Sequence, residues 1–206
     1  MTRSYWIGWL ACALMACQST APERRRDLAL SRIPLEVESI SGLSGLTTDG
    51  NGHLWSVAER DWTLVEIYEG AVLRTVKLPN LGTEIDIEAI TWMGGQRFAL
   101  GTERDLERQI DEVIEITLQG DVAHISQRWS LSYAAFGLDP EPNEGIEALC
   151  ALGEDWLLAI GEPVVVDPES GIRRAPMWRM TTSGKGITHG WLELTSDKGK
   201  IAALAC

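Results

Sequence analysis

Four short segments of the sequence follow one pattern, and this repeat constrains the fold more than any other feature. The segments are Leu43–Leu46 (LSGL), Ile87–Ile90 (IEAI), Ile146–Leu149 (IEAL) and Ile201–Leu204 (IAAL), spaced by 44, 59 and 55 residues. After each of the first three, a glycine follows four residues later and a glutamate thirteen residues later; these are Gly50, Gly94 and Gly153, and Glu59, Glu103 and Glu162. A gap-free interval with glycine near its middle predicts a β-hairpin with a two-residue loop, because glycine readily takes the positive φ that such a loop requires.

A second hairpin is predicted in each repeat, around Glu69-Gly70, Gln119-Gly120 and Ser183-Gly184-Lys185-Gly186. The flanking arms are Thr63 to Tyr68 and Ala71 to Leu78, Glu112 to Leu118 and Val122 to Trp129, and Ala175 to Thr182 and Ile187 to Leu194. Four strands per repeat, with no convincing amphipathic helix between them, are typical of propeller blades. The sequence therefore predicts an all-β fold, a β-propeller with four-stranded antiparallel blades.

About three blades are complete and a fourth has begun, so the predicted ring is incomplete. Counted from Leu204, the next glycine and glutamate would be residues 204 + 4 = 208 and 204 + 13 = 217, beyond Cys206. Either the sequence is a truncated form of a longer propeller, or the protein exposes an unpaired sheet edge, which natural proteins usually avoid. We expect truncation.

The N-terminus predicts export. Arg3 precedes an uncharged run from Tyr5 to Ala16, which is too short to span a bilayer and is typical of a secretory signal. The run ends Leu14-Met15-Ala16-Cys17, which resembles a bacterial lipobox apart from Met15. In such signals the cysteine is lipidated and becomes the first mature residue; ordinary secretion, with Cys17 a bystander, is the alternative.

These features predict three segments: a lipoprotein signal peptide at residues 1–16, a flexible tether at 17–27 and a partial propeller domain at 28–206. Because two or more acyl chains hold a protein durably on a membrane, the lipid alone would be the anchor. The predicted location is the bacterial cell envelope, at the periplasmic face of the outer membrane or on the cell surface.

The net charge excludes one class of partner. Without Arg3, 17 basic residues face 30 acidic ones, so the mature formal charge is near 17 − 30 = −13. Such a charge repels nucleic acid, which we exclude as a partner.

Cys150 and Cys206 stand at neighbouring positions of neighbouring repeats, but an offset of one residue turns their side chains to opposite faces. Buried free thiols are therefore favoured over a disulfide bond.

Three segments resemble a known family. Ser41–Leu46 (SGLSGL), Asp86–Ile90 (DIEAI) and Asn143–Leu149 (NEGIEAL) are similar to the SGL, DxEGI and EGxEGL segments of the SdiA-regulated and esterase-like-phytase propellers. The resemblance covers about Ser39 to Gly161, with Ala89 and Ala148 in place of the usual glycine. It implies an exported six-bladed-type propeller with acids at the channel mouth and calcium binding in some members, and it points to Asp86, Glu88, Glu144 and Glu147.

Strand pairing predicts that further acids join these. If the hairpins turn at Gly94-Gly95 and Gly153-Glu154, Glu103 lies opposite Asp86 and Glu162 opposite Gly145, so acids of two blades share one rim. Calcium prefers several oxygen ligands, so we predict a cation site drawn from Asp86, Glu88, Glu103, Glu144, Glu147 and Glu162. The alternative is structural: Glu59, Glu103 and Glu162 end strands and pair with nearby arginines.

Two classes of function follow. The first is a binding or scaffold module that is anchored in the membrane by lipid, with an unknown small-molecule or protein ligand; the second is a calcium-dependent phosphoesterase, phytase-like or lactonase-like hydrolase. We favour the first, because a propeller that lacks blades would not hold carboxylates as precisely as catalysis requires. The three histidines, His53, His124 and His189, are dispersed and predicted to lie in turns or on the surface.

Overall fold

The computed structural model describes residues 40, 42–59, 61–81, 85–103, 111–142 and 144–206, all of which lie within the unit of residues 33–206. The predicted signal peptide, the tether and Cys17 lie outside the described residues, as does the start of the predicted propeller domain. Among the described residues, no helix has the length and apolar character needed to cross a membrane.

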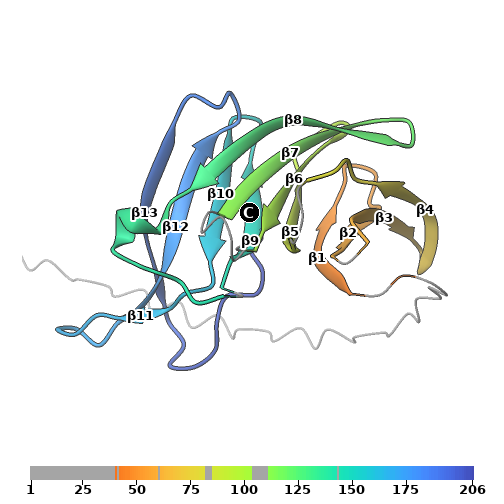
Figure 1. Ribbon diagram of the computed structural model, residues 1–206. Helices are drawn as coiled ribbons and strands as arrows, with labels where there is room; N and C mark the ends of the chain where they lie inside the picture. The colour runs from red at the N-terminus through yellow and green to blue at the C-terminus, as the bar shows by residue number, and fades with distance from the viewer. Residues whose placement is uncertain (1–39, 41, 60, 82–84, 104–110, 143) are drawn as a thin grey trace, which may run out of the picture. The chain divides into compact units, whose positions relative to one another are not determined.

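Three antiparallel meanders form the fold (Figure 1). The first sheet holds β1 (Leu43–Thr48), β2 (Leu54–Ala58), β3 (Thr63–Tyr68) and β4 (Ala71–Lys77). The second holds β5 (Ile87–Trp92), β6 (Arg97–Thr102), β7 (Asp111–Gln119) and β8 (Val122–Leu131). The third holds β9 (Ile146–Leu152), β10 (Trp156–Gly161), β12 (Arg173–Thr181) and β13 (Ile187–Leu194), with the short β11 (Val165–Val166) paired to β12. A 3-10 helix, η1 (Tyr133–Phe136), connects the second and third sheets.

The three sheets are related as neighbouring blades. Their first strands lie side by side, with β5 between β1 and β9, and the later strands of each sheet follow outward in chain order. This confirms the predicted all-β propeller architecture, and the sheets form an open, unclosed arrangement. Ala202 to Leu204, in the fourth copy of the repeat, line a pocket together with residues of β1, β5 and β9, but no strand is assigned to them.

The hairpin loops differ from the prediction in length. The backbone N–H of Asp49 donates to His53 O at 3.0 Å and that of Met93 to Arg97 O at 2.9 Å, and Leu152 pairs with Trp156, so each loop has three residues and not two. Gly50, Gly94 and Gly153 stand first in the three loops, as the equal interval predicted. Gly94 and Gly153 have positive φ (97° and 61°), whereas in the first loop Gly52, at 84°, has this role.

The first two strands of each blade form its inner hairpin, and a β-bulge in each inner hairpin compensates for the longer loop. The register between the first two strands of each blade shifts once, at Ser44/Leu46, at Ile87/Ala89 and at Ile160/Gly161. The shift removes the one residue that the loop added, so the strand ends pair as predicted. The extra residue in the first strand is Gly45 in blade 1, Glu88 in blade 2 and Glu147 in blade 3.

The hydrophobic core lies between successive blades. Phe98 and Leu100 of β6 belong to a buried cluster with residues of blade 1, whereas Ala99, between them, belongs to a cluster with residues of blade 3. This alternation is the period of two expected for a strand that is buried on both faces. Small residues allow neighbouring blades to pack closely: a Cβ on Gly101 would lie 2.8 Å from Cγ2 of Ile146 in the next blade.

A disulfide bond joins Cys150 to Cys206, with their Cα atoms 5.8 Å apart, which corrects the prediction of free thiols. That prediction assumed that both cysteines sit on strands in equivalent register. Residues 201–206 form no strand, so the alternation of faces that would have separated the two sulfur atoms does not apply to Cys206.

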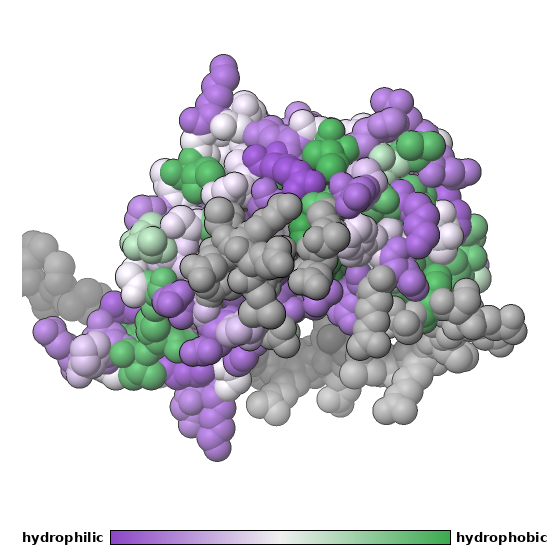
Figure 2. Space-filling model, viewed as in Figure 1, coloured by the Kyte–Doolittle hydropathy of each residue, from purple (hydrophilic) through white to green (hydrophobic). Residues whose placement is uncertain are grey.

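Exposed large hydrophobic side chains are distributed over the blades, from Leu46 on β1 to Ile187 on β13. Figure 2 shows hydrophilic and hydrophobic residues interspersed over the visible face. The contrast between equivalent positions is sharper: Leu46 is 62% exposed, while Ile90 and Leu149 are each 4% exposed. Among the described residues, Leu46 of blade 1 therefore lacks the neighbours that cover Ile90 of blade 2 and Leu149 of blade 3.

Candidate functional site

The repeated glutamates stand at the same level of the three blades. The backbone N–H of Glu59 donates to Gly42 O at 3.0 Å, that of Glu103 to Asp86 O at 2.9 Å and that of Glu162 to Gly145 O at 2.9 Å. The predicted pairing of Glu103 with Asp86 and of Glu162 with Gly145 is therefore confirmed. Each bond closes the end of an inner hairpin, which brings the three side chains to one rim.

The bulges add a second set of polar side chains at this rim. Glu88 and Glu147 are the extra residues of their bulged strands, and Ser44 holds the corresponding position of the repeat in blade 1. A bulge turns the side chain of the extra residue away from the regular alternation of the strand. We call the resulting set the acidic arc: Glu59, Ser44, Glu88, Glu103, Glu147 and Glu162.

The arc is continuous from blade 1 to blade 3. The Ser44 hydroxyl lies 2.8 Å from Oε2 of Glu88 and 3.0 Å from Oε2 of Glu59, and its single proton donates to one of them at a time. Carboxylate oxygens of Glu103, Glu147 and Glu162 lie within 4.8 Å of one another. At the far end, the ammonium group of Lys200 donates to Oε1 of Glu162.

Negative charge accumulates in the middle of the arc. Partial burial, and then the neighbouring charges of Glu88, Glu147 and Asp86, raise the pKa of Glu103 from 4.5 to about 7. Burial and the charges of Glu162 and Glu88 raise the pKa of Glu147 to about 7 as well. The pKa of Glu88 is also raised, mainly by burial, although the Ser44 hydroxyl opposes the shift. The middle of the arc is therefore the place where an added positive charge would be most stabilised.

The six predicted metal ligands separate into two groups. Glu103, Glu147 and Glu162 come together, and Asp86 and Glu88 are near enough for their charges to act on Glu103. Glu144 instead accepts the backbone N–H of Glu141 at 3.0 Å, which closes a local turn. The structural alternative was that the repeated glutamates pair with nearby arginines; the arginines that directly follow Glu59 and Glu103 are Arg60 and Arg104, and both lie outside the described residues.

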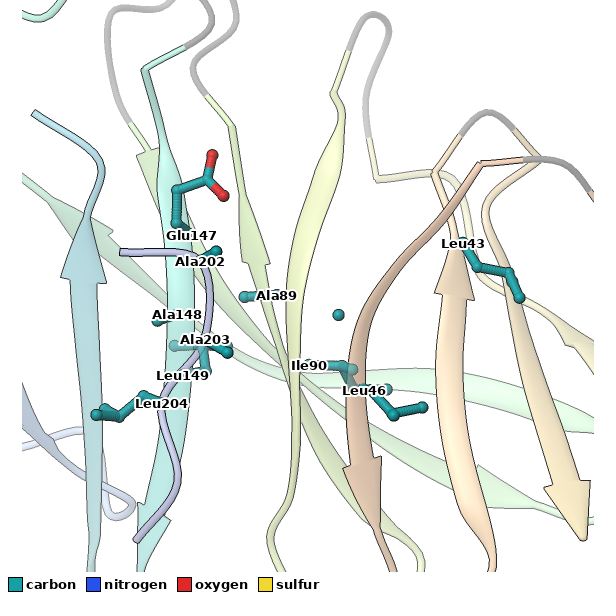
Figure 3. Close-up of a pocket in the computed structure, with 11 residues that line it drawn as sticks. Leu43, Leu46, Ala89, Ile90, Glu147, Ala148, Leu149, Ala202, Ala203 and Leu204 are labelled. Carbon is teal, nitrogen blue, oxygen red and sulfur yellow. The ribbon is translucent and has the colours of Figure 1, made fainter. Parts of the chain in front are cut away.

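A pocket of about 330 Å³ lies beside the arc, between the first strands of the blades. Most of the residues that line it have apolar side chains, among them Leu43, Leu46, Ile90 and Leu149, and Glu147 is its acidic member. Figure 3 shows Glu147 at one end of the pocket, with Leu149 and Leu204 further along it. A ligand in the pocket would meet a surface of mixed polar and apolar atoms and, at one end, a carboxylate.

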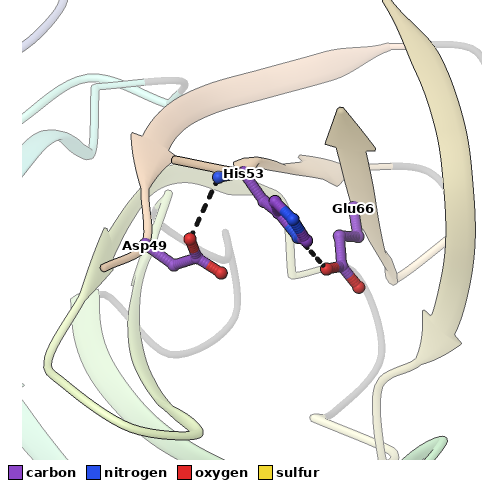
Figure 4. A group of neighbouring side chains, drawn as sticks. All are labelled: Asp49, His53 and Glu66. Carbon is purple, nitrogen blue, oxygen red and sulfur yellow. Dashed lines mark hydrogen bonds and ion pairs between the residues drawn. The ribbon is translucent and has the colours of Figure 1, made fainter. Parts of the chain in front are cut away.

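A second group of ionisable side chains lies at the opposite ends of the blade 1 hairpins (Figure 4). Nδ1 of His53 lies 2.5 Å from Oε1 of Glu66, and Nε of Arg74 donates to Oε2 of Glu66 at 2.5 Å. Asp49 accepts the backbone N–H groups of Asn51 and His53 at 2.8 and 3.0 Å. These backbone bonds and the burial of Asp49 act in opposite directions, and the net result is a lowered pKa of Asp49. We call Asp49, His53, Glu66 and Arg74 the balanced cluster.

Sequence reasoning missed Ser44, Lys200 and the balanced cluster. Alignment of the repeat contained the signal for Ser44, which stands where the other blades have Glu88 and Glu147. It also placed Lys200 at the position of Asp86 and Gly145. His53 borders a turn, as predicted, but its partner Glu66 comes from the facing strand β3, which no local pattern indicates.

The fold and the arc together define a β-propeller module with an acidic rim. The sequence profile of the SdiA-regulated family matches residues 27–162, more than half of the chain, so the chain belongs to the SdiA-regulated family. This confirms the SdiA-regulated part of the resemblance seen in the three motifs, whereas the phytase-like part stays a prediction.

Solved structures with similar folds are distant in sequence. The chain is similar to the Dos1 propeller, with a TM-score of 0.48 and 9% identity over 79% of this chain and 39% of that one. It is also similar to a protein of unknown function from Bacteroides caccae (TM-score 0.46, 14% identity, 80% and 54% covered) and to the PQQ-bound aldose sugar dehydrogenase of Streptomyces coelicolor (0.43, 9%, 86% and 87%). The chain thus spans well under two thirds of the first two structures. No curated protein matches it.

Proposed function

We propose that this chain is a binding propeller of the bacterial cell envelope whose acidic arc takes a divalent cation such as calcium. The observation that carries the proposal is the group of Glu103, Glu147 and Glu162, whose carboxylate oxygens lie within 4.8 Å of one another. Calcium takes six to eight oxygen ligands at about 2.3–2.6 Å, and an arc of short carboxylates offers several of them.

Charge supports the same conclusion. Like charges at this separation are costly, and here the cost is visible in the raised pKa values of Glu103 and Glu147. A divalent cation would offset that repulsion and lower both pKa values, so its binding would release protons near pH 7. The bound ion would leave the pocket beside the arc free for a small-molecule or protein ligand.

Calcium titration tests the proposal. The melting temperature should rise with added CaCl2, because an ion that binds only the folded state stabilises it by about 2.7 kcal/mol at a hundredfold excess over its dissociation constant. Glu103→Gln with Glu147→Gln keeps side-chain size, removes two charges and should abolish the rise. The control, Glu154→Gln with Glu169→Gln, removes two exposed charges elsewhere and should leave it intact. A wild-type protein whose melting temperature ignores calcium would refute the cation site.

The location is a separate part of the proposal. The support for it is the uncharged run from Tyr5 to Ala16 and the lipobox-like Leu14-Met15-Ala16-Cys17. We expect the mature N-terminal peptide to begin with a lipidated Cys17, and Cys17→Ala to release the protein from membranes. Mass spectrometry decides between the two outcomes, since an unmodified peptide beginning after Ala16 would refute lipidation.

A calcium-dependent hydrolase is the second candidate, and one observation favours it. A carboxyl group with a pKa of about 7, such as that of Glu103 or Glu147, is suited to general acid–base catalysis at neutral pH. The hydrolase would release phosphate from a phosphomonoester, or open a lactone, only with calcium present. Calcium binding without turnover of either substrate class would favour the binding module.

A further inference from the structure

The acidic arc already contacts one cation of the chain itself, Lys200. Lys200 directly precedes Ile201–Leu204, the fourth copy of the repeat, and therefore stands where blades 2 and 3 have Asp86 and Gly145. Its ammonium group contacts Oε1 of Glu162, whose side chain is only 12% exposed, while the Lys200 side chain is 57% exposed. The hydrogen bond to Glu162, and then the charges of Glu162, Glu144 and Glu147, raise the pKa of Lys200, so the ammonium form is favoured.

The chain around Lys200 holds the ammonium group in place. The guanidinium group of Arg173 donates to Ser196 O at 2.9 Å and to Gly199 O at 2.5 Å, which fixes the residue next to Lys200. On the other side, Ile201 and Leu204 pack against a buried cluster of blade 3. A long side chain that starts from a fixed backbone loses less conformational entropy when it forms an ion pair.

Glu162 is also a member of the proposed cation site. Its Oε1 contacts Lys200, whereas its Oε2 is buried and has no hydrogen-bond partner among the described residues. A buried carboxylate oxygen without a donor is costly and points to a ligand on that side. Glu147, which has a carboxylate oxygen within 4.8 Å of one of Glu162, also interacts with the charge of Lys200.

We propose that Lys200 is a tethered competitor for the divalent cation: its ammonium group pairs with Glu162 and partly offsets the charge of Glu147 in the ion-free protein, and must be displaced when the ion binds. This inference rests on the proposed cation site and adds its regulation. The competitor would set the affinity threshold of the site. It would also keep the arc from binding ions at low concentration.

Isothermal titration with CaCl2 tests the competition. We expect Lys200→Met to bind calcium about fivefold more tightly than the wild type, the upper range for loss of one competing ion pair. Arg173→Gln keeps Lys200 but loosens the backbone beside it, and should bind about twofold more tightly. Lys185→Met is the matched control, because it removes the same unit charge from the turn at the other end of blade 3 and should bind as the wild type does.

The outcomes separate the two proposals. Equal calcium affinities for the wild type and Lys200→Met would refute the competition and leave the cation site standing. The same gain in Lys185→Met would also refute it, because net charge would then be the cause. If neither the wild type nor Lys200→Met binds calcium, the cation site itself is refuted, and the competition with it.

Discussion

The acidic arc and the balanced cluster both place carboxylates close together, yet their surroundings differ. Glu66 in the balanced cluster has a side chain only 11% exposed and contacts His53 and Arg74, both at 2.5 Å. Glu103 in the arc is half-buried, and the charges that act on it most strongly are those of other carboxylates, Glu88, Glu147 and Asp86. Carboxylates that pair with a cation of their own chain are part of the packed structure, whereas carboxylates that mainly face one another indicate a site for a ligand.

The two groups also differ in where their residues come from. Every member of the balanced cluster belongs to blade 1, while the arc draws on all three blades. The arc therefore depends on how the blades pack against one another. One tight contact with backbone lies between Gly145, just before β9, and Glu103, just after β6: a Cβ on Gly145 would lie 2.3 Å from Cα of Glu103.

The largest expected effect follows from that contact. Gly145→Ala should lower the free energy of unfolding by about 3 kcal/mol, because the added methyl group meets backbone that cannot move without displacing blade 2 from blade 3. Urea denaturation measures the loss. Gly190→Ala, on β13, is the control, since a Cβ there meets nothing within 4 Å. A Gly145→Ala protein as stable as this control would mean that the blades are not packed as described.

Removal of the cation from the balanced cluster should cost somewhat less. Arg74→Met leaves Glu66 buried with His53 as its remaining partner, and should lower the free energy of unfolding by about 2 kcal/mol. Arg74 also lies over the Trp55 ring at 5.3 Å, a contact that methionine keeps only in part. Urea denaturation measures the loss. A loss below about 0.5 kcal/mol would show that Glu66 does not depend on Arg74.

The sequence predicted the arc better than the balanced cluster for a physical reason. The arc follows the repeat, and the equal interval of thirteen residues holds in space because the three-residue loops and the bulges change the register by one residue in opposite directions. The predicted loop length of two residues was wrong, and the bulge was not predicted. The balanced cluster depends on contacts between strands β2 and β3 that lie outside the four-residue motif; its counterpart in blade 2 is the ion pair of Arg97 with Glu115 at 2.9 Å. Cys206 was misassigned for the opposite reason, because there the repeat stops forming strands.

The pH dependence of stability should come from the arc. The pKa values of Glu103 and Glu147 are 4.5 in the unfolded chain and about 7 in the folded protein, so the folded state binds protons more tightly between these values. The stability that this binding contributes is present below pH 4.5 and is lost as pH rises through 7. After allowance for solvent screening of half-exposed groups, the loss should be about 1–2 kcal/mol in total.

Melting temperatures measured in EDTA between pH 5 and pH 8 check this expectation. The wild-type protein should melt at a lower temperature at pH 8 than at pH 5, and Glu103→Gln with Glu147→Gln should flatten the difference. Calcium at pH 8 should restore the wild type to its stability at pH 5, because the ion replaces the protons. A melting temperature that rises steadily from pH 5 to pH 8 would contradict the assigned shifts.

The smallest expected effect concerns Ser44, the one member of the arc that is not an acid. Its hydroxyl donates to Glu88 or Glu59, and this bond lowers the pKa of Glu88 against the burial that raises it. Ser44→Ala should therefore raise the pKa of Glu88 further and lower the free energy of unfolding at pH 8 by about 0.5–1 kcal/mol, the range for one hydrogen bond to a carboxylate in a partly exposed site. A carboxyl ¹³C titration by NMR, with Glu88 assigned by the Glu88→Gln spectrum, measures the pKa. Thr47→Ser is the control: it keeps the hydroxyl that accepts the Trp92 backbone N–H and should leave Glu88 unchanged. An unchanged pKa of Glu88 in Ser44→Ala would show that the serine merely fills its position in the repeat, and that the arc begins at blade 2.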